Sequence, residues 1–501
     1  MTESVAQGAH KSANKLFQYP EYLKERFLKT SDIEFRYSKT VTPEEIWHFM
    51  TVDAPRRYPY AYEINPWFMD QISADIGFLT GIKCRYLRLS QKDRFLEAHN
   101  NGVPIIFTQG GQTFEPYYAA GGIPLRPGLI ARFADDMTEG QTLLQTSQDH
   151  KEKLEFGNKL LTTESCPIVG PHISAQRGLI PVDLIAPYLC LRCSDKQYLV
   201  ESYRNTKNVE SYKNPASRGP FYKDKIPLML IDYPIDNQND KEWATDYLET
   251  MLRNLTAKVS ELSGKEVTDK VLAEEIHYEN KVRKITQDLV HLWWKAPAPP
   301  TNSSDFAGTS NTSAGVFRIG NEFSGDPNGA YSVLKDAYTE IAERVRTGVK
   351  GVGVSDDPVR LYICGPAATE TTDPGFIDSI GGVVVGKDDQ WSEICTLVDE
   401  GGNNPYRNLA KAILSFPMEL PTEERAQWTI EQVKQSRADG LIFTHTWGCN
   451  FQSSVARMIC DIVRDEAGIP VMDMGTAGGF NAQGEEQSKT RLGAFIEMVN
   501  G

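Results

Sequence analysis

The sequence predicts an α/β protein with two Rossmann-like domains, each a doubly wound parallel sheet, with an intervening helical domain and a helical N-terminal extension. Short apolar runs bounded by turn residues occur before residue 236 and again after residue 351. Such runs are typical of strands buried on both faces of a parallel sheet. Long amphipathic repeats separate the two groups. In addition, two segments share one predicted order: strand, cysteine, helix, Ile-Pro and strand.

Residues 1–100 form the predicted N-terminal extension, which is rich in aromatic and charged residues and is expected to be mostly helical. The first Rossmann-like domain is expected over residues 101–236. Its predicted strands lie in VPIIF, IPL, VDLIAPYL and KIPLMLID, and glycine pairs follow VPIIF and precede IPL. These glycines mark the turns that bound a short helix.

The helical domain is expected over residues 237–350. Its first helix places most of its apolar residues on one face, and Gly264 is a plausible stop. Thr268 or Asp269 is expected to cap the second helix. The Pro/Ser/Gly-rich segment Ala296–Gly315 is expected to be a loop or linker.

The second Rossmann-like domain is expected over residues 351–501. Its predicted strands lie in VRLYICGP, IGGVVVG, GLIFTHTW and IPVMDMG, and a final helix is expected near residues 485–499. The echo between the two domains pairs VDLIAPYLCLRC and IPLMLIDYP with GLIFTHTWGC and IPVMDMG.

The composition argues against several classes of partner. The chain has 501 residues and a formal net charge of −14, which disfavours general binding to nucleic acid or to an anionic membrane. No stretch approaches the roughly 18–20 apolar residues of a membrane-spanning helix. The first residues lack the apolar core of a signal peptide, so a cytoplasmic protein is expected. Its eight cysteines are then expected to be ligands, nucleophiles or buried thiols rather than disulfides.

Cys193 and Cys449 both follow predicted strands, one in each domain. In doubly wound sheets, ligands bind beyond the carboxyl ends of the strands, so these cysteines are expected to face one another across a cleft. Cys166 lies on a third loop, before a proline. Three thiolates from separate loops suit an iron–sulfur cluster. Three ligands on a four-iron cubane would leave one iron open.

Other interpretations of the cysteines stay open at this point. Cys364 and Cys460 lie in apolar runs typical of a core, and Cys84 has no evident partner. Cys395 suits the core or a ligand position. Cys190 and Cys193 form a C-x-x-C pair, which also suits zinc or thiol redox chemistry, although no second close pair is present. Cys449 is a ligand, a nucleophile or a structural thiol.

Several common catalytic motifs are missing from the sequence. It contains no Walker-type phosphate loop, no G-x-S-x-G elbow, no H-E-x-x-H, and no G-x-G-x-x-G after a strand. His445 is the histidine nearest to the cysteine loop after its strand, and it is expected to be an internally hydrogen-bonded strand residue.

Five segments together resemble the 2-hydroxyacyl-CoA dehydratase / benzoyl-CoA reductase family. They are TFEPYYAAGGIPLRPG, SCPIVGPHISAQ, LRCSDKQYLVESY, IPLMLIDYP with the helices after it, and DGLIFTHTWGCNFQSSVARMI with the C-terminal helix. The resemblance spans roughly residue 100 to the end. Their order makes it more specific than any single cysteine.

The resemblance implies that Cys166, Cys193 and Cys449 bind a [4Fe–4S] cluster between the domains. It implies a homologous second subunit, in a hetero- or homodimer, and a separate ATP-hydrolysing iron–sulfur activator that supplies one electron. The reaction implied is reductive elimination of water from a 2-hydroxyacyl-CoA through a ketyl radical anion. Glu115 occupies the family's glutamate position and would orient substrate or move a proton. Alternatively, Glu115 only favours the positive end of a helix dipole.

The sequence also departs from the family pattern. The N-terminal extension is longer than expected, Cys190 is an alternative ligand, and Gln390 and Trp391 intervene before Cys395, a further candidate ligand. A benzoyl-CoA reductase-type subunit and a reductase with a larger double-cubane cluster are therefore alternatives. A non-catalytic subunit that relays electrons or binds its homologue, and a zinc-binding or metal-free α/β binding protein, are alternatives of other classes.

Overall fold

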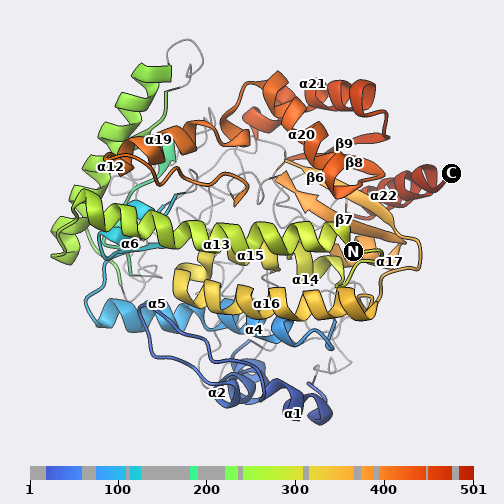
Figure 1. The fold of residues 1–501 in the computed structure, drawn as a ribbon, viewed down its shortest axis with the longest axis horizontal. Helices are drawn as coiled ribbons and strands as arrows, with labels where there is room; N and C mark the ends of the chain where they lie inside the picture. The colour runs from blue at the N-terminus through green and yellow to red at the C-terminus, as the bar shows by residue number, and fades with distance from the viewer. Residues whose placement is uncertain are drawn as a thin grey trace, which may run out of the picture.

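The computed structural model has a mixed α/β fold with parallel sheets, as the sequence predicts. Figure 1 shows α13 crossing the middle of the molecule, with α16 below it and one sheet at the right. No helix in the part of the chain described is long and apolar enough to cross a membrane. The structure describes residues 18–58, 62, 75–108, 113–125, 181–189, 221–234, 241–308, 315–365, 374–388, 394–446, 449–476 and 485–501.

The C-terminal sheet contains four parallel strands in the order β7-β6-β8-β9. The chain adds β7 on one side of β6 and then adds β8 and β9 on the other side. Ligands of open α/β sheets bind at such a reversal of strand order, beyond the carboxyl ends of the strands. The reversal here lies between β6 and β8. The strands are β6 (Val359–Cys364), β7 (Gly382–Lys387), β8 (Gly440–Thr446) and β9 (Val471–Thr476).

The N-terminal strands form one sheet of three strands and one of two. β1 lies between β2 and β3, β4 pairs with β5, and all of these pairs are parallel. A bridge between Ile185 and Leu228 continues the pairing beside β3. The strands are β1 (Ile105–Phe107), β2 (Ile123–Leu125), β3 (Leu184–Ile185), β4 (Tyr188–Leu189) and β5 (Ile231–Asp232).

The two Ile-Pro segments occupy equivalent places in these sheets. The Ile185 N–H donates to the carbonyl oxygen of Pro227 at 2.9 Å, and the Leu441 N–H donates to that of Pro470 at 3.0 Å. Proline has no backbone N–H but keeps its carbonyl acceptor, so it can begin an added parallel strand. The similarity seen in the sequence therefore extends to backbone hydrogen bonds.

Long helices lie between the two groups of strands. Gly264 follows α12 with a φ of +74°, and the Thr268 side chain caps α13 by accepting the Val271 N–H, as the sequence predicts. Apolar residues of α12 and α13 face the core. The helices of this region are α12 (Lys241–Ser263), α13 (Asp269–Lys295), α14 (Ser303–Ala307), α15 (Val316–Glu322), η8 (Phe323–Gly325) and α16 (Pro327–Thr347).

The expectation of a loop or linker over Ala296–Gly315 was wrong for its central part. Ser303–Ala307 form the buried helix α14, which the Asn302 side chain caps by accepting the Asp305 N–H at 2.9 Å. The Ser303 hydroxyl and N–H donate to the buried Asp378 carboxylate. Ser303 and Asp305, polar residues typical of loops, are buried here because each finds a partner far away in the sequence, which composition alone does not reveal.

The remaining helices belong to the N-terminal extension, the first α/β region and the C-terminal part of the chain. The described part of the N-terminal extension is largely helical, as expected. It contains η1 (Glu21–Leu23), α1 (Lys24–Phe27), α2 (Pro43–His48), the π-helical turn η2 (Phe49–Asp53), α3 (Ala54–Arg57), α4 (Leu79–Leu89) and α5 (Gln91–Asn100). The others are α6 (Glu115–Ala119), α17 (Pro374–Ser379), α19 (Pro405–Leu414), η10 (Pro417–Glu419), α20 (Thr422–Ser436), α21 (Asn450–Ala467) and α22 (Glu485–Asn500).

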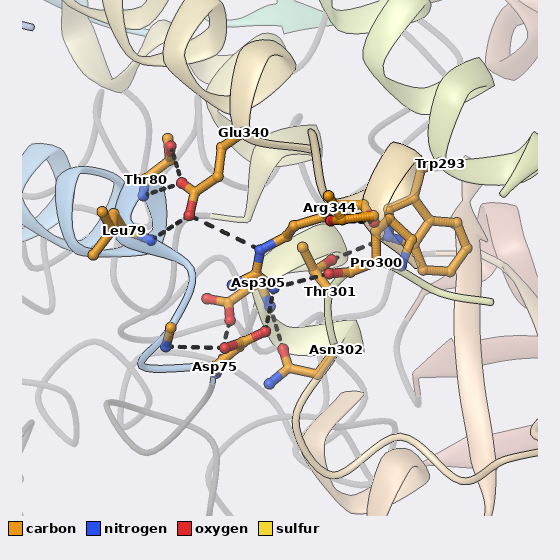
Figure 2. Close-up of polar contacts among 12 residues, drawn as sticks. Asp75, Leu79, Thr80, Trp293, Pro300, Thr301, Asn302, Asp305, Glu340 and Arg344 are labelled. Atoms are coloured by element: carbon orange, nitrogen blue, oxygen red, sulfur yellow. Dashed lines mark hydrogen bonds and ion pairs between the residues drawn. The ribbon is translucent and has the colours of Figure 1, made fainter. Parts of the chain in front are cut away.

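Buried ionic contacts fix the N-terminal extension to α16. Figure 2 shows the Glu340 carboxylate at the start of α4, where it accepts the N–H groups of Leu79 and Thr80 at 2.8 Å each. A carboxylate at the positive end of a helix dipole is favourable. One turn further along α16, Arg344 forms an ion pair with Asp75 and donates to the Pro300 carbonyl oxygen. The extension is therefore part of the core rather than a separate arm.

Replacing Arg344 with Met is predicted to destabilise the protein by about 3–5 kcal/mol, because the Asp75 carboxylate would remain buried without its partner. Urea unfolding of the full chain measures this change. Arg346→Met is the matched control, since Arg346 lies on the same helix but its ion pair with Glu343 is exposed. Equal stability of the two variants would contradict the proposed role of Arg344.

Candidate functional site

Cys449 lies directly before α21 and acts as its N-cap residue. It follows β8, one of the two strands between which the strand order reverses, and it is partly exposed. The Ser453 N–H donates to the Cys449 carbonyl oxygen at 3.0 Å and closes the first turn of α21. The residue therefore occupies the edge of the sheet at which α/β proteins bind ligands. Cys166, Cys190 and Cys193 lie outside the described residues.

Three other cysteines are buried, as predicted for Cys364 and Cys460. Burial raises the pKa of the Cys364 thiol well above its usual value and raises that of Cys460 to about 12. Burial likewise raises the pKa of Cys84. Such thiols are unreactive parts of the core. Among the described cysteines, only Cys395 and Cys449 are partly exposed.

The segment that carries Cys395 lies along α13. The Asn280 side chain both accepts the Val398 N–H at 3.1 Å and donates to the Val398 carbonyl oxygen at 2.8 Å. Gln287 donates to the carbonyl oxygen of Ile394 at 2.7 Å. These side chains hydrogen-bond the backbone of a segment that is irregular from residue 396 to residue 400. Cys395 is thereby fixed to the helical region rather than left on a free loop.

His445 is hydrogen-bonded within the protein, as the sequence predicts. Its Nε2 atom lies 2.9 Å from Asp473 Oδ1 on β9, and its Nδ1 atom lies 3.2 Å from Ser453 Oγ on α21. The imidazole therefore joins two strands and the first turn of the helix that Cys449 caps.

Glu115, the predicted catalytic residue, opens the short helix α6 and is fully buried. Its Oε1 atom lies 2.7 Å from Nη2 of Arg283 on α13. The same Arg283 nitrogen lies 3.6 Å from Oε2 of Glu279, which is also fully buried. The described contacts of Glu115 are thus with α13, and they do not include Cys395 or Cys449.

Glu279 and Arg283 were not predicted as site residues. Neither Glu279 oxygen accepts a hydrogen bond from the residues that the structure describes. Burial, followed by the charge of Glu115, raises the pKa of Glu279 well above its usual value. One guanidinium cannot neutralise two buried carboxylates, and the uncompensated charge favours the protonated form of Glu279. Charged residues at positions 275, 279 and 283, on the otherwise apolar face of α13, were the signal available in the sequence.

A second ion pair adjoins this one. Arg36, from the N-terminal extension, donates to both carboxylate oxygens of Glu275 at 2.8 Å. Burial raises the pKa of Glu275, against the lowering effect of Arg36. Glu115, Glu275 and Glu279 with Arg36 and Arg283 form what we call the α13 charge cluster. When all five are ionised, the three carboxylates and two guanidiniums leave one formal negative charge.

The described residues fit an iron–sulfur cluster in part. Iron–sulfur clusters need thiolate ligands, and the two partly exposed cysteines lie on segments that follow β7 and β8 of one sheet. No group of three or more His, Cys, Asp or Glu residues within the described ranges is arranged to hold a metal ion. Further ligands would have to come from the three cysteines outside those ranges.

Replacing Glu279 with Gln is predicted to flatten the dependence of stability on pH. Because the folded-state pKa of Glu279 is raised, the unfolded chain ionises first, and this residue's contribution to stability falls as pH rises above about 4.5. Gln cannot ionise, so the variant should gain stability relative to wild type between pH 5 and pH 8. The gain should be at least about 1 kcal/mol, measured by chemical unfolding at each pH. Glu274→Gln, at an exposed position of α13, is the control. If the difference in unfolding free energy between wild type and Glu279→Gln did not depend on pH, the raised pKa of Glu279 would be contradicted.

Thiol reactivity should follow the burial just described. In the folded, reduced, iron-free protein, iodoacetamide should modify Cys449 and Cys395 well before Cys84, Cys364 and Cys460, because buried thiols stay protonated and inaccessible. Peptide mass spectrometry over a time course measures each site. Early modification of Cys364 on β6, or of Cys460 on α21, would show that the core around that element opens locally.

Comparison with known proteins gives two matches. Residues 115–499 match the protein family described as 2-hydroxyglutaryl-CoA dehydratase, D-component. The chain is also similar to the (R)-phenyllactyl-CoA dehydratase beta subunit of Clostridium sporogenes. It is 24% identical to that protein over 281 residues, which are 54% of this chain and 68% of the relative. The family match begins at Glu115 and includes the helical region and the C-terminal sheet.

Proposed function

The chain belongs to the 2-hydroxyglutaryl-CoA dehydratase D-component family, and on this premise we propose that it is the cluster-binding subunit of a 2-hydroxyacyl-CoA dehydratase. It would take part in the elimination of water from a 2-hydroxyacyl-CoA after one-electron reduction of the thioester. Both matches carry dehydratase names, which favours this reaction over ring reduction.

The position of Cys449 is the observation that carries the proposal. It lies at the reversal of strand order, beyond the carboxyl end of β8, and its thiol is partly exposed. Three other described cysteines are buried in the core and raised in pKa, so they are unsuited to bind a ligand. The chemistry expected of the family and the ligand-binding edge of the fold therefore meet at one residue.

We propose Cys166 and Cys193 as the further ligands of a [4Fe–4S] cluster. Cys193 follows β4 in the sequence as Cys449 follows β8, and the strands of both regions pair in parallel. In this proposal both groups of strands belong to doubly wound Rossmann-like domains. Cys190 and Cys395 are the alternative ligands, and their use would suit a larger cluster.

A bound cluster would supply the single electron that activates the thioester. The chain's own residues would hold the ligand and manage protons. Glu115 is the proposed catalytic residue, and Arg283 fixes one of its carboxylate oxygens. The raised pKa of Glu279, beside Glu115, makes Glu279 a better proton donor near neutral pH than a solitary exposed glutamate. In this structure the pair is enclosed, so the substrate would have to meet it after movement of α6.

The proposal includes partners. The similar protein from Clostridium sporogenes is named as a beta subunit, and we propose that this chain likewise pairs with a homologous subunit. The sequence has no phosphate-binding loop, which suits a separate ATP-hydrolysing activator as the electron source. (R)-Phenyllactyl-CoA is a reasonable first substrate to test with the assembled enzyme.

Anaerobic purification should yield a coloured protein with about four irons and four acid-labile sulfides per chain. Cys449→Ala should lose most of this iron, because a thiolate ligand is removed. Cys460→Ala is the matched control, since this buried thiol lies on the same α21 helix and its removal should leave the iron content unchanged. About eight irons would indicate the double-cubane alternative. A folded, iron-free wild-type protein would overturn the proposal.

A further inference from the structure

Three loops leave the C-terminal sheet at the carboxyl ends of β6, β7 and β8. The first begins at Gly365, the second at Asp388, and the third leads to Cys449. Asp388, Arg425 and Gln452 are buried at this edge, with exposed fractions of 0%, 1% and 2%. Polar groups so deeply buried are costly unless they are paired, so their contacts show what they hold in place.

The Asp388 carboxylate joins two of these loops to α20. Its Oδ1 atom accepts the Gly365 N–H at 2.7 Å, and its Oδ2 atom accepts a hydrogen bond from Arg425 Nη2 at 2.6 Å. Gly365 has a φ of +84°, and a β-carbon there would lie 2.0 Å from the Thr444 carbonyl oxygen. Gly365 thus lies directly against the backbone of β8, where a side chain would clash.

Arg425 extends the same contact to the third loop. Its Nη1 atom donates to Gln452 Oε1 at 3.1 Å, and Gln452 belongs to the first turn of α21. Its guanidinium carbon lies 5.8 Å from the ring centres of Phe443 on β8 and Phe451 on α21. One side chain therefore contacts the β7 loop, the strand before Cys449 and the helix after it.

The opposite side of this helical turn is held by the chain of Asp473, His445 and Ser453. Gln452 and Ser453 are adjacent. Gln452 accepts a hydrogen bond from the buried Arg425, while Ser453 is hydrogen-bonded to the more exposed His445. The Ser453 N–H also closes the turn onto Cys449. Hydrogen bonds on two sides fix this first turn of α21. The backbone of its N-cap residue, Cys449, therefore has little conformational freedom.

We propose that Arg425 is a positioning residue for Cys449, which links the three loops at the sheet edge and sets the cysteine's orientation before any ligand binds. Its planar guanidinium makes two separate bonds, to Asp388 and to Gln452, which a lysine ammonium on a flexible stem reproduces poorly. This inference deepens the proposed function, in which Cys449 is a cluster ligand. Its test uses the iron-free chain, so either proposal can fail while the other stands.

The test compares the reactivity of two cysteines in the same molecule. Full-length, reduced, iron-free protein is treated with iodoacetamide, and the alkylation rates of Cys449 and Cys395 are measured by peptide mass spectrometry. Arg425→Met should raise the alkylation rate of Cys449 at least about threefold, because the turn opens locally, and should leave the rate of Cys395 unchanged. Hydrogen exchange at the Ser453 amide should accelerate in parallel. Arg425→Lys should restore part of the wild-type behaviour.

Two further variants keep the test decisive. Arg464→Met removes an ion pair at the far end of α21 and should change neither rate. If Arg425→Met does not fold, Gln452→Leu removes only the contact with the first turn and should shift the Cys449 rate in the same direction, by a smaller factor. The proposal would be overturned if a folded Arg425→Met protein, or Gln452→Leu, kept the wild-type rates of Cys449 alkylation and of Ser453 amide exchange.

Discussion

Helix α13 is the element to which the other regions of the molecule are fixed. Glu275 holds Arg36 of the N-terminal extension, Arg283 holds Glu115 of the first α/β region, and Asn280 holds the segment after β7. Near its end, Trp294 donates to a carbonyl oxygen of β7 itself at 2.6 Å. Figure 1 shows this single helix spanning the molecule between these parts. Because the contacts with the N-terminal extension and with Glu115 are ion pairs, these two regions cannot separate from α13 without leaving charges unpaired.

This arrangement places charge where a purely structural core would avoid it. Buried ion pairs add little net stability compared with apolar packing, so a fold that retains several of them gains something other than stability. In the α13 charge cluster the proposed gain is the raised pKa of Glu279, next to Glu115. At the sheet edge it is a fixed orientation for the loop that bears Cys449. Both features are properties of preorganised sites.

Features set by local sequence could be predicted, and features set by distant partners could not. The Gly264 stop and the Thr268 cap depend on neighbouring residues and were predicted correctly. The burial of Cys364 and Cys460 follows from the apolar runs around them. Helix α14 was missed because its polar residues are paired with residues far away in the sequence. Glu279 was missed for the same reason, since its raised pKa comes from burial in the folded protein and from the charge of Glu115, which is distant in sequence.

The central claim is that a metal cluster binds at the carboxyl edge of the C-terminal sheet, beyond the strands β6 and β8. The most direct measurement is an iron-edge anomalous difference map from crystals grown without oxygen. Iron peaks are expected within bonding distance of Cys449 Sγ, beside the first turn of α21. A map without iron peaks from protein that contains iron in solution, or with its peaks away from Cys449, would contradict this claim.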